Sequence, residues 1–341
     1  MPMRHTNILL AAMLCVSCTP VAVSSTDSLQ STLAAFENDA HDDLHSVIVI
    51  QGGRTRAEHY YHGADPQTLV DIRSAGKSVT SLLLGVALDQ GAIKSLDAPV
   101  QRYWTDAAGS AVGSVRLENL LTMRSGLAAD DDVDGLPGNE DRMDDADDPL
   151  SFARSIPSVE PEGSRYRYNS LAAYVTGVVI AQATGRNLEE FARKFLFEPL
   201  GMKRWEWQED RSGQTKGQGN LFLTARDFAR IGQLVLGDGV YEGKRIVSRR
   251  WIEQSLRPRV DISASDPFAT GYGYYWYHRT YPVRGRPTDV YFASGNGGNK
   301  IYVIPDLDMV VSILSRAYGE GRGQRRSEAI LKAVLANVRP L

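Results

Sequence analysis

The chain has 341 residues, of which 43% are hydrophobic and 23% are charged, and its formal net charge is −3. These proportions are ordinary for a soluble globular protein and allow a sizeable core. The weakly acidic balance, without a basic stripe or an RNA-binding motif, excludes nucleic acid as the expected partner.

Residues 1–20 have the pattern of an export signal. A positive start at Arg4 is followed by an apolar run from Ile8 to Val16, which is too short to span a bilayer as a helix. The segment also resembles a bacterial lipobox that ends at Cys18. Plain cleavage and a lipid anchor at Cys18 both stay open. We expect an exported protein, periplasmic or membrane-anchored, with no disulfide and no transmembrane span in the mature chain.

The first elements after the signal are a helix, a strand pair and a second helix. Residues 28–40 have apolar positions at helical spacing, and residues 45–63 have the pattern of two strands around a Gly-Gly turn. An apolar helix then begins near residue 76 and ends at Gly91, which suits a helix C-cap. Helical patterns dominate from there up to a helix that begins with the capping box of Thr224 and Asp227.

The C-terminal part returns to strands. Strand patterns occur at 271–279, 289–295 and 300–315, and a final helix is predicted over residues 324–337. Strands at both ends with helices between them predict an α+β chain, in which one sheet is built from the two ends and interrupted by a helical insertion. The expected parts are a sheet subdomain at 26–112 and 268–341 and a helical subdomain at 113–267.

Residues 130–148 are an acidic loop with ten carboxylates and one arginine. Three alternate aspartates from Asp130 have the spacing of the first half of a calcium-binding EF loop, with Asp141 at its twelfth position. Pro137 interrupts this pattern, so we expect a solvated loop of like charges rather than a calcium site. No His or Cys cluster has metal-ligand spacing, and we expect neither a metal nor another cofactor.

The segment 71–81 contains the only Ser-x-x-Lys sequence of the chain, from Ser74 to Lys77. Positions i and i+3 of a helix lie on one face, which would bring the lysine amine to the serine hydroxyl. Such a hydroxyl is a weak nucleophile until a base takes its proton, and Lys77 must be desolvated or near another cation to be neutral. Ser74 could instead be a helix cap, and the spacing alone leaves both interpretations open.

Tyr168 is a second candidate, because the run Tyr168-Asn169-Ser170 precedes another helical pattern. A tyrosine hydroxyl beside a lysine cation can accept or relay a proton. Considered alone, this residue would be interpreted as a half-buried loop tyrosine.

Taken together, three motifs resemble the serine β-lactamase and penicillin-binding protein superfamily, and in particular its class C β-lactamase-like branch. They are the Ser-x-x-Lys helix, Tyr-x-Ser at 168–170, and a strand ending at Ser294-Gly295 before a glycine-rich turn. Further blocks follow in the usual order of that branch, among them "LENLLTMRSGL", "FEPLGM" and "IYVIPDLDMVV". The resemblance implies a β-lactamase/transpeptidase-like fold, with an antiparallel sheet flanked by helices in three α/β/α layers and an inserted all-helical subdomain.

The resemblance also implies roles for individual residues. Ser74 matches the acylated nucleophile, Lys77 its partner base, and Tyr168 the tyrosine that passes protons to the leaving group. Backbone N–H groups of Ser74 and Asn296 would form the oxyanion hole. Three further residues of these motifs are expected to contact the substrate: Ser170, Ser294 and Gly295.

The sequence departs from the family pattern at two places. Ala293 stands where Lys-Thr-Gly or His-x-Gly would begin, and Ser170 stands where β-lactamases commonly have Asn. The Ala293-Ser294-Gly295 strand and the block "TMRSGL" both look closer to the esterase and aminohexanoate-oligomer hydrolase branch. Ala293 thus lacks the positive charge that a lysine would supply at this position. Other cations that could supply it are Lys300, Arg142 and Arg165.

We therefore expect a serine hydrolase that cleaves a small-molecule amide or ester through an acyl-enzyme. The alternatives are a true β-lactamase, a D-alanyl-D-alanine peptidase, or a protein that binds or senses cell-wall fragments without turnover.

Overall fold

The computed structural model describes residues 1–2 and 25–338. Residues 3–20 of the expected export signal, including Cys18, lie outside the described residues, so export and lipidation stay predictions. Within the described residues, no helix is both long enough and apolar enough to cross a membrane.

An eight-stranded antiparallel sheet joins the two ends of the chain, in the order β2-β1-β13-β12-β11-β10-β9-β8. β1 (Leu44–Gln51) pairs with β13 (Met309–Ser315), as expected for a sheet built from both ends. Both strands are buried almost throughout, because helices cover the two faces. The other strands are β2 (Arg54–Tyr60), β8 (Val260–Asp261), β9 (Gly271–Tyr272), β10 (Tyr277–Val283), β11 (Arg286–Gly295) and β12 (Asn299–Ile304).

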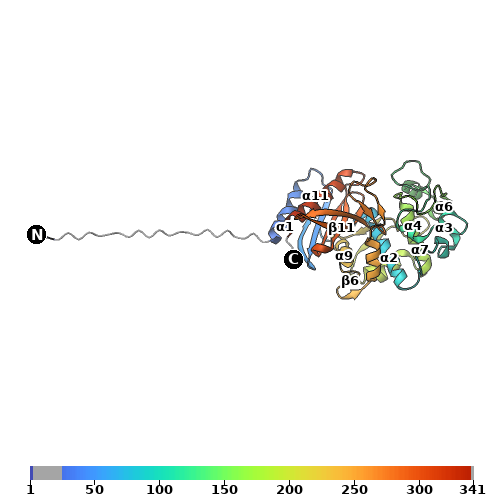
Figure 1. Ribbon diagram of the computed structural model, residues 1–341, viewed down its shortest axis with the longest axis horizontal. Helices are drawn as coiled ribbons and strands as arrows, with labels where there is room; N and C mark the ends of the chain where they lie inside the picture. Colours follow the sequence, from blue (N-terminus) through green and yellow to red (C-terminus); the bar gives the residue numbers. More distant parts are fainter. Residues whose placement is uncertain (3–24, 339–341) are drawn as a thin grey trace.

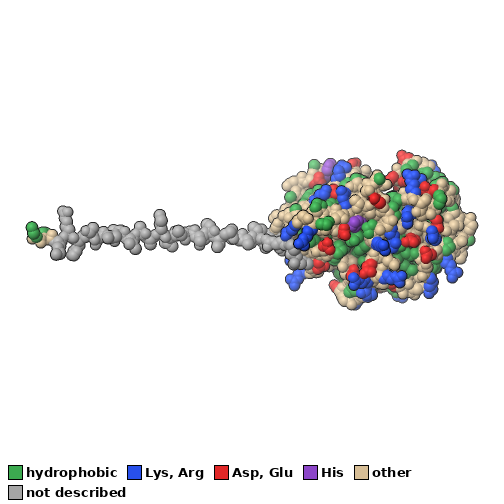
Figure 2. Space-filling view, in the orientation of Figure 1, with side chains coloured by type: hydrophobic (Ala, Val, Ile, Leu, Met, Phe, Trp, Pro, Cys, Tyr) green, Lys and Arg blue, Asp and Glu red, His purple; other side chains and the backbone are tan. Residues whose placement is uncertain are grey.

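Helices on the two faces of the sheet give three layers (Figure 1). α1 (Ser25–Ala34) and α11 (Gly321–Asn337) pack together on one face, and α9 (Ala225–Leu236) packs against β12 and β13 on the other. At Gly232 of α9, an added Cβ would lie 2.6 Å from side-chain atoms of the sheet, so glycine permits the close approach of helix and sheet there. Acidic and basic side chains are interspersed over the face of the molecule drawn in Figure 2.

Most of the remaining helices gather in a second part, at the right of Figure 1, and α2 (Gly76–Asp89) lies between this part and the sheet. α2 packs against α7 on one side and β11 on the other, so its N-terminus lies at the junction of the two parts. The other helices are α3 (Ala111–Ser114), α4 (Leu117–Leu121), α5 (Glu140–Asp145), α6 (Pro149–Ser155), α7 (Ser170–Thr184), α8 (Leu188–Ala192) and α10 (Arg249–Leu256). Short strands complete the fold: β3 (Val70–Asp71), β5 (Leu221–Leu223) and β4 (Trp205–Trp207) in one sheet, and β6 (Val240–Tyr241) with β7 (Lys244–Arg245) in another.

The architecture confirms the predicted α+β class and the antiparallel sheet between helices. The range 113–267 is less purely helical than expected, because β8 joins the large sheet and α9 covers it. The strand expected at 271–279 is broken into β9 and β10 by a turn in which Gly273 N–H donates to Trp276 O and Tyr275 has φ 62°. The limits of the two subdomains stay a prediction.

Candidate active site

Ser74 lies in a 3-10 turn, Arg73–Ala75, that connects β3 to α2. The strand before it is fixed by pairing, since Ile72 N–H donates to Leu221 O at 2.9 Å. Arg73 has φ 53°, in the left-handed region, and its N–H donates to the Asp71 carboxylate at 2.8 Å. The chain therefore turns sharply just before Ser74, which is half-buried rather than enclosed in a regular helix.

Two glycines let other segments approach this turn closely. A Cβ at Gly295, the last residue of β11, would lie 2.0 Å from Ile72 O and 3.1 Å from Ala75 N. A Cβ at Gly219 would lie 3.1 Å from the Arg73 carbonyl atoms. No side chain fits at 2.0 Å, so glycine at position 295 brings the end of β11 directly against the Ser74 turn.

Lys77 is the centre of a polar cluster beneath Ser74. The side chain is only 2% exposed, and its Nζ donates to Ser74 Oγ at 2.9 Å, to Ser170 Oγ at 3.0 Å and to Gln218 O at 3.2 Å. These three acceptors satisfy all three ammonium hydrogens. Nζ also lies 5.0 Å from the centroid of the Tyr168 ring. The structure thus brings the Ser74–Lys77 motif together with Tyr168, Ser170 and the Gln218 carbonyl, which are distant from it in sequence.

The surroundings of Lys77 favour its ammonium form. Burial by itself lowers the pKa of a lysine, but the charges of Tyr168, Glu140 and Asp131 and a hydrogen bond with Tyr168 outweigh burial and raise the pKa of Lys77 above its ordinary value. A base at this position would have to be neutral. In the free enzyme, the side chain of Lys77 is therefore a buried ammonium next to Ser74, and not the neutral amine expected from the sequence.

The turn after β11 is held by a buried asparagine. Asn299 donates through Nδ2 to Asn296 O at 2.9 Å and to Asp71 O at 3.3 Å, while its Oδ1 accepts from Ser315 N–H at 3.0 Å. One side chain therefore ties the segment carrying the Asn296 backbone to the strand that precedes Ser74. Asn299 belongs to none of the sequence motifs. Its side chain is fully buried, and this burial depends on the tertiary structure.

These residues border a pocket of about 580 Å³. The pocket is lined by Ser74, Tyr168, Ser294, Gly295 and Asn296. Ser170 is fully buried and accepts a hydrogen bond from Lys77. Further lining side chains are Asp130, Asp131, Asp132, Glu140, Arg165, Tyr166, Asp266, Phe268, Tyr277 and Lys300.

The acidic loop differs from the expected solvated loop. Its Asp131 is half-buried, and the Asp131 N–H donates to Tyr168 O at 2.9 Å, while the carboxylate accepts from Glu140 N–H at 3.1 Å. Burial raises the pKa of Asp131 to about 6, opposed by the positive charge of Lys77 and supported by the negative charge of Glu140. The loop folds inward because it pairs with the backbone of the tyrosine segment, and it thereby adds a carboxylate to the site.

Tyr166 is the other tyrosine of this segment, and its surroundings are different. Its ring packs edge-on against Tyr272, with the centroids 5.4 Å apart, and burial raises the pKa of Tyr166 well above its ordinary value. Of the two tyrosines, Tyr168 is the one that lies over the Lys77 ammonium.

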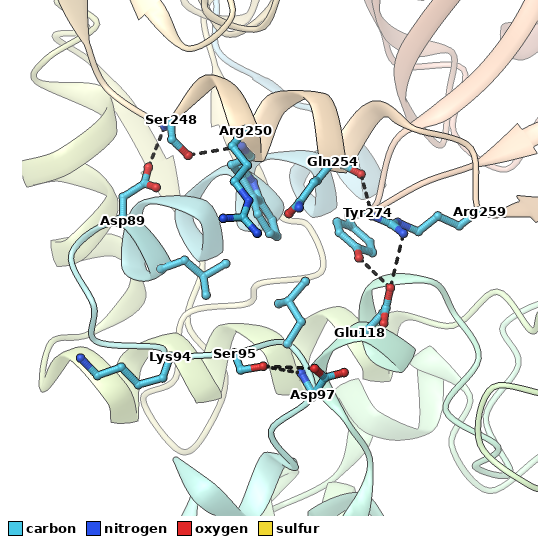
Figure 3. Close-up of a pocket in the computed structure, with 13 residues that line it drawn as sticks. Asp89, Lys94, Ser95, Asp97, Glu118, Ser248, Arg250, Gln254, Arg259 and Tyr274 are labelled. Atoms are coloured by element: carbon cyan, nitrogen blue, oxygen red, sulfur yellow. Dashed lines mark hydrogen bonds and ion pairs between the residues drawn. The ribbon is translucent and has the colours of Figure 1, made fainter.

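A second cavity of about 520 Å³ lies at the far end of α2 (Figure 3). Its serines have structural partners: Ser248 caps α10, with its N–H bound to Asp89 at 2.7 Å, and Ser95 accepts from Asp97 N–H at 3.1 Å. Glu118 accepts from Tyr274 at 2.7 Å in the same cavity. Neither serine of this cavity is hydrogen-bonded to a lysine or tyrosine side chain in the part of the chain described, whereas Ser74 is, so the pocket at Ser74 is the candidate active site.

Metal ligands do not gather at either cavity. Among residues 25–338, no group of three or more His, Cys, Asp or Glu side chains is arranged to hold a metal ion. In the acidic loop, Asp130 and Asp131 instead bind backbone N–H groups, and Asp144 and Asp147 pair with Lys216 and Arg211.

The chain is similar to known proteins over most of its length. The model of the Beta-lactamase family matches residues 42–335. A 6-aminohexanoate-dimer hydrolase from Paenarthrobacter ureafaciens is 26% identical over 304 residues, which cover 85% of this chain and 77% of that protein. A beta-lactamase from Escherichia coli (strain K12) is 26% identical over 200 residues, which cover 58% of this chain and 50% of that protein.

Solved structures show the same fold. A family VIII carboxylesterase superposes with a TM-score of 0.72 at 17% identity, covering 92% of this chain and 99% of that one. A class C beta-lactamase from Rhodobacter sphaeroides has a TM-score of 0.65 at 19% identity, with 91% and 100% covered. The β-lactamase/transpeptidase-like fold implied by the motifs is thereby confirmed. The chain belongs to the Beta-lactamase family and is a serine hydrolase.

Proposed function

We propose that this hydrolase cleaves small amides or esters through an acyl-enzyme on Ser74. The observation that carries the proposal is the hydrogen bond of 2.9 Å from Lys77 Nζ to Ser74 Oγ, at the border of a pocket that Tyr168 also lines. A serine hydroxyl held by a buried lysine and open to a pocket has the arrangement of an activated nucleophile.

In the proposed first half-reaction, Ser74 Oγ attacks the substrate carbonyl carbon and loses its proton. Because Lys77 keeps its own proton, we assign acceptance of the serine proton to Tyr168 in its phenolate form, which becomes the neutral phenol, and stabilisation of negative charge to the Lys77 ammonium. Tyr168 then gives the proton to the leaving amine or alcohol as the bond to it breaks. A water molecule repeats the sequence on the acyl-enzyme and releases the acid.

The developing oxyanion requires donors beside Ser74. In this proposal the backbone N–H groups of Ser74 and Asn296 supply them, as in oxyanion holes generally. Support comes from the close approach that Gly295 permits and from the Asn299 side chain that fixes the turn. Donors held in this way need no rearrangement when charge develops.

The substrate class rests on the third motif and on the relatives. The side chain of Ala293 carries no charge, so the position that usually carries the family's lysine offers no cation to the pocket. The relatives named above include a 6-aminohexanoate-dimer hydrolase and a carboxylesterase. We propose esters and amides as substrates ahead of β-lactams, and export to the periplasm or its membrane surface from the pattern of residues 1–20.

The test is a side-by-side assay of purified protein with nitrophenyl butyrate, nitrocefin and a D-Ala-D-Ala peptide, with Ser74→Ala as control. Steady turnover of the ester that disappears in the variant supports the proposal. Preference for nitrocefin would favour a β-lactamase, preference for the peptide a D-alanyl-D-alanine peptidase, and a burst without turnover a binding or sensing protein.

A further inference from the structure

The first turns of α11 pack directly against the glycine-rich turn that follows β11. A Cβ at Gly323 would lie 2.3 Å from Gly297 O, and a Cβ at Gly298 would lie 2.4 Å from Gly323 O. Neither distance leaves room for a side chain, so the two backbones touch. The buried Ser327 side chain, one turn further along α11, donates to Gly298 O at 2.6 Å. The helix is therefore fixed against the turn that begins at Asn296.

Gln324 extends from this part of α11 to the end of β11. Its Nε2 donates to Gly295 O at 2.8 Å, and the same oxygen accepts from Gly298 N–H at 3.2 Å. A carbonyl oxygen has two lone pairs and only accepts, so it can bind both donors, and the amide nitrogen of Gln324 must be the atom that faces it. Gln324 is half-buried and lines the Ser74 pocket, but the proposed reaction assigns it no role.

The acceptor of this hydrogen bond belongs to the peptide unit that carries a proposed oxyanion donor. Gly295 C=O and Asn296 N–H are the two polar groups of one planar peptide unit, and this peptide bond is trans. In a trans unit the two groups point in opposite directions, so a donor that fixes the direction of the C=O also fixes that of the N–H. A hydrogen bond to the C=O also polarises the unit and makes its N–H a stronger donor.

Asn299 acts on a different peptide unit. Its Nδ2 donates to Asn296 O, which belongs to the unit that follows the donor N–H. The Asn296 side chain is also held, because its Oδ1 accepts from Gly319 N–H at 2.9 Å. Within the described part of the chain, the side chain that binds the donor unit itself is that of Gln324.

We infer that Gln324 is a positioning residue of the oxyanion hole: it holds the Gly295–Asn296 peptide unit so that the Asn296 N–H stays directed at the substrate oxygen beside Ser74. Because α11 supplies this contact, the C-terminal helix takes part in the site although it carries none of the three sequence motifs. The inference rests on the proposed acyl-enzyme reaction at Ser74.

The experiment compares Gln324→Met with Ser327→Ala. Gln324→Met keeps the length of the side chain and removes its N–H donor, whereas Ser327→Ala removes the hydrogen bond from α11 to Gly298 O, outside the donor unit. Gln324→Asn is a second variant, which keeps the amide group on a shorter side chain that does not reach Gly295 O. For each variant we would measure kcat and KM for nitrophenyl butyrate, the rate of labelling by a serine-reactive phosphonate, and Tm.

In Gln324→Met and Gln324→Asn, kcat is expected to fall about 5- to 50-fold while KM changes by less than about twofold, because the contact matters most when charge develops on the substrate oxygen. The fall is smaller than the roughly 10²–10³-fold loss caused by removal of a whole oxyanion donor. Phosphonate labelling should slow in parallel, because the phosphonate oxygen develops charge in the same place. In Ser327→Ala, Tm should fall while kcat stays within about twofold of the wild-type value.

The assignment of Gln324 would be overturned by a kcat within about twofold of the wild-type value in a folded Gln324 variant, by a change confined to KM, or by unchanged phosphonate labelling. An equal loss of kcat in Ser327→Ala would also overturn it, because the packing of α11 alone would then explain the effect. If Gln324→Met does not fold, Gln324→Asn decides. A different result marks failure of the proposed function itself: the wild type would not hydrolyse nitrophenyl butyrate, or Ser74→Ala would hydrolyse it equally well.

Discussion

Lys77 Nζ donates a hydrogen bond of 2.9 Å to Ser74 Oγ, and the same nitrogen lies 5.0 Å from the centre of the Tyr168 ring. The lysine therefore contacts both the expected nucleophile and the expected proton carrier. Because the pKa of Lys77 is raised, this arrangement places a cation next to the Ser74 hydroxyl and beside the Tyr168 ring.

Tyr168 is proposed to accept the serine proton and Lys77 to stabilise the negative charge. Removal of either side chain is therefore expected to reduce the activity strongly. Lys77→Ala and Tyr168→Phe should each lower kcat/KM for nitrophenyl butyrate by about 10²–10⁴, the usual contribution of general acid–base catalysis. Tyr166→Phe is the control, because Tyr166 packs on Tyr272 and not on Lys77. A mild effect of Tyr168→Phe together with a severe effect of Tyr166→Phe would show that the wrong tyrosine has been assigned.

Asp131→Asn is expected to make the protein more stable at neutral pH. The folded-state pKa of about 6 lies above the ordinary value of an aspartate, so the folded state binds this proton more tightly than the unfolded chain does. The wild type therefore loses stability at Asp131 as the pH rises from about 4 to 6, by about 1–3 kcal/mol. Asn does not titrate, so the stability gain of the variant should be present at pH 7 and absent at pH 4.

Denaturant unfolding of the wild type and Asp131→Asn at pH 4 and 7 measures this difference. Asp134→Asn serves as the control for removal of a carboxylate from the exposed part of the same loop. An equal stability change at both pH values would contradict the assignment of a titrating, buried Asp131.

Asn299 is expected to position the oxyanion donors. Asn299→Ala removes its hydrogen bonds to Asn296 and Asp71, so kcat should fall while KM changes little, because the turn is needed most when charge develops on the substrate oxygen. Steady-state kinetics with nitrophenyl butyrate distinguish a loss of oxyanion stabilisation from simple destabilisation of the fold, provided that the assay temperature lies well below the Tm of the variant. A rise in KM at constant kcat would assign Asn299 to substrate binding instead.

Chelation is expected to leave the activity unchanged. The reaction proposed here uses only side chains and backbone donors, and the acidic loop uses its carboxylates to bind backbone N–H groups. Ester hydrolysis and Tm should therefore be the same after exhaustive EDTA treatment and after addition of calcium. A reproducible calcium-dependent rise in Tm would instead identify residues 130–141 as a binding site.

The sequence predicted the parts of the site that lie in local motifs. Ser74, in the 3-10 turn before α2, and Lys77, in the first turn of α2, are three residues apart in the chain, and Thr224 caps α9 through Asp227 N–H as its pattern indicated. These features depend on contacts between near neighbours in the chain. Strand periodicity also predicted the long strands of the large sheet, and helical periodicity predicted the long helices that cover it.

The parts that the sequence did not predict depend on tertiary contacts. Asp131 belongs to a run of like charges, and only the backbone pairing of its loop with Tyr168 turns its carboxylate inward. Lys300 was one of three candidate cations, and only the pairing register that sets it opposite Ser294 shows that it reaches the pocket. Strands of two or three residues, such as β3, β4 and β5, are too short to give a periodic signal.

Covalent labelling tests the central claim most directly. Intact-protein mass spectrometry after treatment with a serine-reactive phosphonate should show one adduct on the wild type, mapped to Ser74, and none on a folded Ser74→Ala variant. Labelling that persists in Ser74→Ala, or an adduct that maps to another serine, would contradict Ser74 as the nucleophile.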